Sequence, residues 1–334
     1  MKAVGLYKYL PITDENSLQD IEVAKPKAMG RDLLVAVKSI SVNPVDTKVR
    51  APKEKVETDP RILGWDAAGV VVAVGEQVTQ FKLGDEVYYA GDITRPGTNS
   101  EFHLVDERIV GRKPSTLGFA EAAALPLTGI TAWESLFERL QISRAGEDAG
   151  KSILIIGGAG GVGSLAIQMA KKIAKLHVIA TASRPETDEW CRTLGADEIA
   201  NHRNDLAEQV EQADYILCLN ATDAHWQAMG KIIKPQGTLC TIVENEQPLE
   251  MDQLKLKSVG FVWEFMFTRS MYETEDMDEQ AKLLNEIGQL VDKEVLQTTC
   301  TDVVSPINAS NLRAVHARVE AGSSIGKTVL AGWA

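Results

Sequence analysis

A run of five glycines within seven residues, GGAGGVG (Gly157–Gly163), constrains the fold more than any other feature of this sequence. Glycine loses more conformational freedom on folding than any other residue, so such a cluster beside an apolar segment needs a structural reason. The run follows the apolar segment SILII (Ser152–Ile156) and precedes apolar residues at helical spacing over 165–176. This pattern predicts a buried strand, a tight glycine turn and an amphipathic helix.

After residue 151, short apolar segments alternate with helical patterns. Such alternation is typical of βαβ units, so we predict an α/β domain with a doubly wound parallel sheet. The expected strands are Ser152–Ile156, His177–Ala182, Tyr215–Asn220 and Thr238–Val243. The expected helices are Val162–Leu176, Glu186–Leu194, Leu206–Gln212 and Ala224–Ile233, followed later by Asp278–Asp292 and Ala309–Ala321.

The first 110 residues consist of short β-branched runs separated by Gly, Pro, Asn and Asp, which predicts a compact all-β unit. The expected strands are Leu33–Val42, Ala67–Gly75, Asp85–Gly91 and Glu101–Val110. The tail Lys327–Trp333 also has a strand pattern, and the sequence leaves open which sheet it joins.

The glycine run contains the spacing G-x-G-x-x-G between a strand and a helix, which is the context of a dinucleotide-binding fingerprint. We expect Gly158 to permit the turn, Gly160 to let the backbone approach a pyrophosphate, and Gly163 to let helix and strand pack closely. The alternative is a glycine-rich turn without a ligand. The residues of the predicted site are Gly158, Ala159, Gly160, Gly161, Val162 and Gly163.

The second expected strand ends in Thr181-Ala182-Ser183-Arg184, without the acid that usually binds the ribose 2′-hydroxyl. Ser183 can donate to a 2′-phosphate and Arg184 can pair with one, so we predict NADPH as the cofactor, bound in part by Thr181, Ser183 and Arg184. In the alternative interpretation, Arg184 is a solvated surface residue and Glu186 or Asp188 reaches the ribose.

A net charge of −12 argues against nucleic acid and against an anionic membrane surface as partners. No apolar run is long enough to span a bilayer, and the N-terminus lacks a signal-peptide pattern. The four cysteines form no C-x-x-C pair. This spacing fits scattered reduced thiols, and we expect a cytoplasmic protein.

Several segments in order along the chain resemble the medium-chain dehydrogenase/reductase superfamily, in particular its zinc-free quinone oxidoreductase branch, whose members are often named zinc-type alcohol dehydrogenase-like proteins. The resemblance implies a GroES-like β domain over 1–125, completed by 300–334, and a Rossmann NADPH-binding domain over 126–299. It also implies a homodimer paired through the Rossmann sheet. The matching segments are Ser41–Arg50, Gly64–Tyr88, Ala122–Leu136, Gly157–Gly163, Leu194–Asp197 and Trp263–Met271.

The resemblance raises the question of zinc, and the residues argue against a metal site. Zinc-dependent members have Cys at the position of Asn43 and a His-Glu pair at the positions of Trp65 and Asp66. Asn and Trp are poor ligands, and catalytic zinc needs about three protein ligands. The cluster of four cysteines that binds structural zinc is missing from Gly91–Val110, where we expect the lone His103 to be a satisfied strand residue.

Hydride transfer to a quinone or an α,β-unsaturated carbonyl needs no Lewis acid, because the acceptor delocalises the incoming charge. We therefore predict an NADPH-dependent reductase of such a small molecule. The alternatives are a zinc-dependent alcohol dehydrogenase, or an NADPH-binding protein with a mainly structural or regulatory role. The expected catalytic residues are Asn43, Asp46, Asp66 and Tyr88.

The resemblance and the strand ends add further candidates. Thr128 and Lys327 match family positions near the cofactor, and the carboxyl ends of two later strands line the ligand crevice. We expect cofactor contacts from Asn220, Ile242, Val243 and Glu244, and an acceptor pocket formed by Trp65, Tyr89, Phe265 and Phe267. Three alternatives stay open: Asp46 as a capping carboxylate, Lys327 as a solvated lysine, and Trp263–Phe267 as a core or dimer contact.

Overall fold

The computed structural model describes residues 1–333, and the chain divides into two compact units. Unit one comprises Met1–Leu127 and Phe267–Ala334, and unit two comprises Thr128–Met266. The predicted Rossmann segment ended at 299, whereas unit two ends at Met266. The intervening residues pack within unit one, where Leu284 accepts a hydrogen bond from Tyr88 and Asp292 binds Ser115 and Thr116.

Unit two contains a six-stranded parallel sheet in the order β11-β10-β9-β12-β13-β14. This order corresponds to 3-2-1-4-5-6, the doubly wound Rossmann arrangement, and it confirms the predicted fold class. The strands are β9 (Ser152–Ile156), β10 (His177–Thr181), β11 (Glu198–Ala200), β12 (Ala213–Cys218), β13 (Ile233–Thr241) and β14 (Gly260–Trp263).

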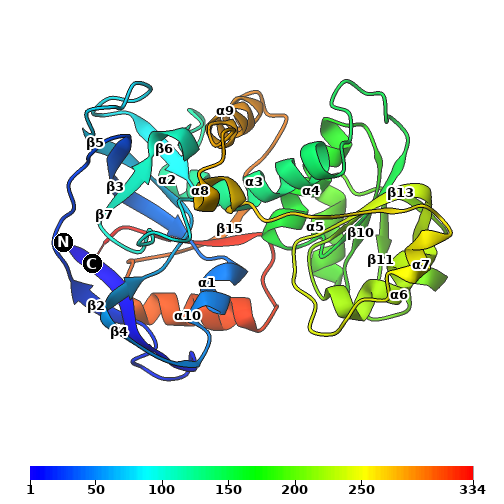
Figure 1. The fold of residues 1–334 in the computed structure, drawn as a ribbon, viewed down its shortest axis with the longest axis horizontal. Helices are drawn as coiled ribbons and strands as arrows, with labels where there is room; N and C mark the ends of the chain where they lie inside the picture. Colours follow the sequence, from blue (N-terminus) through cyan, green and yellow to red (C-terminus); the bar gives the residue numbers. More distant parts are fainter. Residues whose placement is uncertain (334) are drawn as a thin grey trace. The chain divides into compact units, whose positions relative to one another are not determined.

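The helices of unit two connect these strands and cover the sheet (Figure 1). Leu154, Ile216 and Leu239 of the sheet pack with Trp226 and Met229 in one buried apolar cluster. The segment predicted as a helix over 206–212 forms only a short 3-10 turn, Leu206–Glu208. The helices are α4 (Gly161–Lys172), α5 (Pro185–Leu194), α6 (Thr222–Ile232) and α7 (Asp252–Lys255), and α3 (Pro126–Trp133) leads into a π-helical stretch, Glu134–Arg139.

Unit one is built on a seven-stranded sheet in which the C-terminal strand β16 (Lys327–Ala331) pairs with β3 (Asp32–Ser41). The tail therefore joins the N-terminal β domain. The other strands of this sheet are β5 (Ala67–Val74), β6 (Glu86–Tyr89), β7 (Phe102–Asp106), β8 (Gly111–Arg112) and β15 (Cys300–Val304). A three-stranded sheet contains β1 (Lys2–Tyr9), β2 (Gln19–Glu22) and β4 (Lys53–Ile62).

Helices pack against these sheets within unit one. The short helix α1 (Pro44–Arg50) follows β3, and the C-terminal helix α10 (Ala309–Glu320) lies beside it (Figure 1). The remaining helices are α2 (Phe119–Ala123), α8 (Thr268–Tyr272) and α9 (Glu279–Asp292).

Candidate functional site

The glycine turn of unit two joins β9 to α4. Gly157 adopts a φ of 90°, the left-handed conformation that favours glycine, and its N–H donates to Thr181 Oγ1 at 3.0 Å. A Cβ on Gly163 would lie 2.3 Å from the Gly157 carbonyl oxygen, so strand and helix approach too closely for any side chain. The left-handed residue thus precedes the G-x-G-x-x-G motif, and Gly163 has the packing role expected of it.

Two other glycines of the turn differ in their surroundings. A Cβ on Gly158 would meet the Ala180 Cβ at 2.9 Å, whereas a Cβ on Gly160 would find no atom closer than 3.5 Å. The turn lies between β9 and β12, where the strand order reverses and doubly wound folds bind their ligands. Its backbone therefore fits a pyrophosphate of NAD(P), with open space in front of Gly160.

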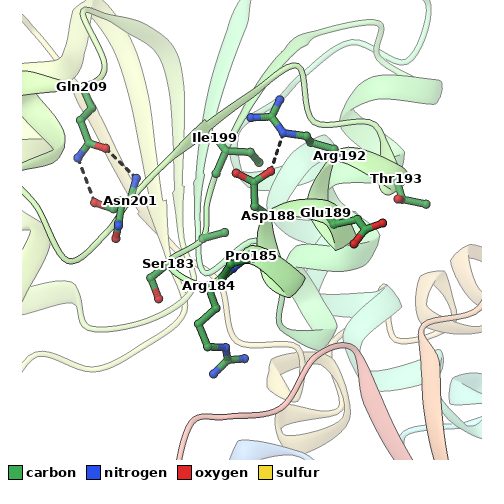
Figure 2. A pocket seen from close by; sticks show the side chains of 11 residues that line it. Ser183, Arg184, Pro185, Asp188, Glu189, Arg192, Thr193, Ile199, Asn201 and Gln209 are labelled. Atoms are coloured by element: carbon green, nitrogen blue, oxygen red, sulfur yellow. Dashed lines mark hydrogen bonds and ion pairs between the residues drawn. The ribbon is translucent and has the colours of Figure 1, made fainter.

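A pocket of about 700 Å³ lies where β10 and β11 end. Ser183 and Arg184 line it, and Figure 2 shows the Arg184 side chain lying apart from the Asp188–Arg192 pair. Arg184 Nε lies 2.8 Å from Glu186 Oε1, so the neighbouring acid is ion-paired to the arginine. Both acids that could have reached a ribose thus have a cationic partner, Arg184 at the N-cap of α5 for Glu186 and Arg192 within α5 for Asp188.

Two residues after β11, His202 and Arg203, add to this region and escaped prediction from the sequence. Burial lowers the pKa of His202, and the positive charges of Arg203 and Arg184 lower it further. Arg184 and Arg203 are therefore both near His202, and their two guanidinium groups form a local basic group in an acidic chain. The HR dipeptide directly after a strand of the sheet was the available signal, but that short strand was not predicted.

The other predicted cofactor residues follow neighbouring strands of the same sheet. Asn220 follows β12, and Ile242 to Glu244 follow β13. Thr222 Oγ1 donates to the Val243 carbonyl oxygen at 2.8 Å, which ties these two strand ends together. Thr128 is buried in α3 of the same unit.

In unit one, the carboxylate of Asp66 is completely buried among hydrogen-bond donors. Its Oδ2 atom accepts from Ser41 Oγ at 2.8 Å and from Asn43 Nδ2 at 2.8 Å, and it lies 3.3 Å from Lys327 Nζ. Its Oδ1 atom accepts from the Leu127 backbone N–H at 2.8 Å. Four donors therefore surround the carboxylate, three at Oδ2 and one at Oδ1.

The ammonium of Lys327 is the cationic partner in this cluster. Lys327 Nζ donates to the Val42 carbonyl oxygen at 2.8 Å, to Asn43 Oδ1 and to Asp66 Oδ2. Burial lowers the pKa of Lys327, and the nearby carboxylates oppose that shift. All three ammonium protons therefore have protein acceptors, and the interpretation of Lys327 as a solvated surface lysine is wrong. Its predicted contact with the cofactor stays a prediction.

These contacts decide whether the position fits zinc. Both oxygens of the Asp66 carboxylate are engaged by protein donors, and the Asn43 amide bonds both Lys327 and Asp66. A divalent cation would also lie beside the ammonium of a buried lysine. The donor set therefore does not fit zinc. Within residues 1–333, no three or more His, Cys, Asp and Glu side chains gather in a way that could hold a metal ion.

Asp46 belongs to the same cluster but has fewer partners. Its Oδ2 atom accepts from the backbone N–H of Asn43 at 2.5 Å, as a capping carboxylate of α1. Its Oδ1 atom is buried and has no hydrogen-bond partner. Burial raises the pKa of Asp46 to about 7, and the Asp66 charge contributes to the rise.

Tyr88 and Tyr89 of β6 are both buried, and each hydroxyl has a partner. Tyr88 donates to the Leu284 carbonyl oxygen at 2.5 Å, and burial raises its pKa. The Tyr89 hydroxyl lies 3.2 Å from His103 Nδ1, and His103 Nε2 lies 2.9 Å from the Pro96 carbonyl oxygen. His103 is thus the satisfied residue that was expected, and neither tyrosine has an unengaged hydroxyl.

The predicted aromatic pocket residues do not form one set. Trp65 and Phe267 pack edge to face with their ring centroids 6.1 Å apart, and both are buried in unit one. Tyr89 instead stacks on His103. Phe265 is 44% exposed and belongs to unit two.

Comparison with known proteins places these features in a family. The pattern of the alcohol dehydrogenase GroES-like domain matches residues 30–133, and that of the zinc-binding dehydrogenases matches residues 194–330. In the part of the chain that the structure describes, no helix is long and apolar enough to cross a membrane.

Individual proteins resemble the whole chain or about two thirds of it. A zinc-type alcohol dehydrogenase-like protein of Staphylococcus aureus is 44% identical over 99% of both chains. The crystal structure of a Rhizobium etli protein, described as a zinc-dependent alcohol dehydrogenase protein, matches this chain with a TM-score of 0.95. The two sequences are 52% identical, and the match covers 100% of this chain and 98% of the other. An NADPH-dependent alkenal/one oxidoreductase of Arabidopsis thaliana is 37% identical over 66% of this chain and 57% of its own. The chain belongs to the zinc-type alcohol dehydrogenase-like proteins, within the medium-chain dehydrogenase/reductase superfamily of NAD(P)-dependent oxidoreductases.

Proposed function

We propose that this protein is an NADPH-dependent, zinc-independent oxidoreductase that transfers hydride to a quinone or an α,β-unsaturated carbonyl compound. The observation that carries the proposal is the set of donors around Asp66. Lys327, Ser41, Asn43 and the Leu127 N–H use its acceptor positions, so the site lacks the ligands for a Lewis-acid metal.

The chemistry of the acceptor follows from that donor set. Bound NADPH supplies the hydride, and an enone or quinone spreads the resulting negative charge onto its oxygen without a metal. The Asn43 amide is oriented by Lys327 on its oxygen and Asp66 on its nitrogen, which leaves one N–H proton for a ligand. We assign that donor to the cofactor or the acceptor oxygen. Asn43→Ala should lower kcat/KM by about 100-fold, and an unchanged value would remove Asn43 from the site.

The preference for NADPH is supported by the basic group after β10 and β11. Arg184 and the nearby Arg203 offer positive charge, and Ser183 offers a hydroxyl, in the region where we expect the ribose 2′-phosphate. The relative from Arabidopsis, which is named as NADPH-dependent and acts on alkenals and alkenones, supports the same cofactor and acceptor class.

The direct test is NADPH oxidation by the purified protein against a panel of quinones, enones, aldehydes and simple ketones, repeated with NADH. We expect turnover with the first two classes and a higher kcat/KM with NADPH. Turnover confined to simple alcohols and ketones, together with stoichiometric zinc, would establish the alcohol dehydrogenase alternative. Tight NADPH binding without turnover of any acceptor would establish a structural or regulatory role.

The same proposal includes a homodimer formed along the sheet edge of unit two. β14 is the edge strand of the parallel sheet, and the side chains of Trp263 and Phe265 at its end are 45% and 44% exposed. An open strand edge with exposed aromatic residues favours pairing with a second copy. Sedimentation equilibrium should give twice the chain mass, and Trp263→Lys should give the monomer mass. A monomeric wild type would contradict the dimer.

The proposal also places the protein in the cytoplasm. Cys191, Cys218, Cys240 and Cys300 are all unpaired, which fits a reducing compartment. Cell fractionation should recover the protein with cytosolic markers, and recovery with secreted proteins would contradict this placement.

A further inference from the structure

Two segments of unit two leave the parallel sheet side by side, one after β10 and one after β11. The Ala182 backbone N–H donates to the Ala200 carbonyl oxygen at 3.0 Å, at the point where the pairing of the two strands ends. Arg184 follows on the first segment, and Asn201 and His202 follow on the second. Arg184 and Asn201 both line the pocket of about 700 Å³ (Figure 2), so His202 adjoins the region expected for the 2′-phosphate.

The turn that carries His202 is held by hydrogen bonds within unit two. Asn201 Oδ1 accepts from the Arg203 backbone N–H at 3.0 Å. The Gln209 side-chain amide accepts from the Asn201 N–H at 2.8 Å and donates to the Asn201 carbonyl oxygen at 3.0 Å (Figure 2). These bonds fix the backbone at Asn201, while His202 and Arg203 are exposed to solvent. A bound ligand can therefore reach both side chains.

Three cationic or titratable side chains lie near His202. The charges of Arg203 and Arg184 act on it from its own turn and from the N-cap of α5. His225 lies near it on α6, which packs against the 3-10 turn Leu206–Glu208. Partial burial lowers the pKa of His202, and the two guanidinium charges lower it further. The imidazole is therefore mainly neutral at neutral pH.

Acidic side chains occur on the same elements, and most of them have other partners. Two acids of α5 are ion-paired to arginines, and those of Asp205 and Asp223 accept backbone N–H bonds. The charges that shift the pKa of His202 are those of the two guanidinium groups. The acids of these elements are Glu186, Asp188 and Glu189 on α5, Asp205 and Glu208 next to the turn, and Asp223 on α6.

An anion bound beside Arg184 would reverse this electrostatic situation. A phosphate monoester carries about −1.5 to −2 charges at pH 7, and an opposite charge nearby favours the protonated imidazole. The same anion compensates the guanidinium charges that disfavour protonation. NADPH has such a group in its 2′-phosphate, whereas NADH has a hydroxyl at that position.

We propose that His202 takes up a proton when the 2′-phosphate of NADPH binds, and that it thereby selects NADPH over NADH; this inference rests on the proposed cofactor. The proton comes from the solvent and adds to the neutral imidazole, so the site gains a third cation only in the NADPH complex. The affinity for NADPH rises as the pH falls, and the affinity for NADH does not. His202 is thus a specificity-determining residue that acts through its protonation state.

The direction of the proton transfer identifies its source. The second pKa of a phosphate monoester is about 6, and nearby guanidinium groups lower it, so the phosphate can only release protons on binding. Uptake at neutral pH must therefore come from a protein group. The other histidine of this region is His225, whose pKa is lowered by burial and by the charge of His202. The test accordingly includes a variant of each histidine.

The first measurement is calorimetric titration with NADPH and with NADH at about pH 7, in two buffers of different ionisation enthalpy. The dependence of the binding heat on the buffer gives the number of protons taken up per ligand. We expect about half a proton per NADPH and almost none per NADH. Absence of uptake with NADPH, or equal uptake with NADH, would overturn the proposal.

The second measurement is the Kd for NADPH between about pH 6.5 and about pH 8.5. The wild-type Kd should rise about three- to tenfold over this range, because linkage to one proton permits at most a tenfold change per pH unit. In His202→Gln both the proton uptake and this rise should disappear. His202→Lys carries a permanent cation and should bind NADPH tightly at each pH without proton uptake. His225→Gln is the matched control and should behave like the wild type.

The ways in which the proposal can fail give different results. Retained proton uptake in His202→Gln would overturn the role of His202, even if NADPH is the preferred cofactor. Equal wild-type Kd values for NADPH and NADH would overturn the cofactor preference together with this inference. Because neither measurement contains an acceptor, absence of turnover with quinones and enones would contradict only the proposed reductase activity. His202 is exposed, so its variants should unfold at the wild-type temperature.

Discussion

The two units hold their polar groups in opposite ways. In unit one, Asp66 and Lys327 are enclosed and satisfied by protein partners before any ligand arrives. In unit two, the glycine turn and the pocket beside Arg184 offer backbone and side-chain groups at the carboxyl ends of the parallel strands. The comparison teaches that unit one is organised by charges that compensate one another, whereas unit two is organised to receive charge from a ligand.

The largest effect is expected when the positive charge that compensates Asp66 in unit one is removed. Lys327→Met removes the ammonium and leaves the Asp66 carboxylate buried without its counter-ion. We expect the free energy of unfolding to fall by about 3–5 kcal/mol, measured by denaturant titration. Adding Asp66→Asn should recover part of the loss, because the uncompensated charge disappears. A loss below about 1 kcal/mol, the range typical of surface ion pairs, would contradict a buried compensated pair.

A second prediction compares two glycines of the same turn in unit two. Gly163→Ala should destabilise the protein by about 1–3 kcal/mol, because its Cβ would lie 2.3 Å from a backbone oxygen. Gly160→Ala should leave the unfolding free energy nearly unchanged, because its Cβ has room, but it should weaken NADPH binding by at least about tenfold. Calorimetric titration measures the Kd for NADPH of each variant, and denaturant unfolding measures its free energy of unfolding. Equal stability losses in the two variants would show that the space at Gly160 is not a ligand site.

The third prediction concerns the 2′-phosphate of NADPH, which we expect to bind at Arg184 in unit two. Arg184→Ala should weaken NADPH binding by about ten- to 100-fold and leave NADH binding unchanged, because a charge-assisted hydrogen bond contributes about 1.5–3 kcal/mol. Arg192→Ala is the matched control, since Arg192 lines the same pocket and is also ion-paired to an acid, but its side chain lies apart from that of Arg184 (Figure 2). Equal losses for both cofactors would remove Arg184 from the 2′-phosphate site.

The smallest effect is expected from removing a buried hydroxyl group of unit one that is already hydrogen-bonded within the protein. Tyr88→Phe removes a hydroxyl that donates to the Leu284 carbonyl oxygen. We expect a loss of about 1 kcal/mol in unfolding free energy and no change in kcat, because that proton is already bound within the protein. A fall in kcat of about 100-fold or more would restore Tyr88 as a proton donor.

The sequence predicted most of unit two because its signals are local. The glycine spacing, the apolar strands and the amphipathic helices each lie within one short window, and β9, β10 and α4 appear within a few residues of their expected bounds. β11 and β14 were missed because each contains only three or four residues. Arg203 and His202 were missed with β11, since their meaning depends on the strand that precedes them.

The cluster of unit one could not be derived in this way, because its members are far apart in the chain. Asn43, Asp66 and Lys327 come from three segments that meet only when β16 pairs with β3. Their residue types argued against a zinc site, but the hydrogen bonds among them could be identified only in the folded structure. The predicted boundary at 299 differs from the end of unit two for the same reason, since α9 is held in unit one by contacts such as that of Asp292 with Ser115.

The most direct test of the central claim is the rate of NADPH oxidation with an enone before and after exhaustive dialysis against a zinc chelator, with the metal content measured in the same samples. The account predicts less than about 0.1 zinc per chain and an unchanged rate, because the site around Asp66 and Lys327 lacks zinc ligands. Stoichiometric zinc, with activity lost on chelation and restored by added zinc, would contradict it.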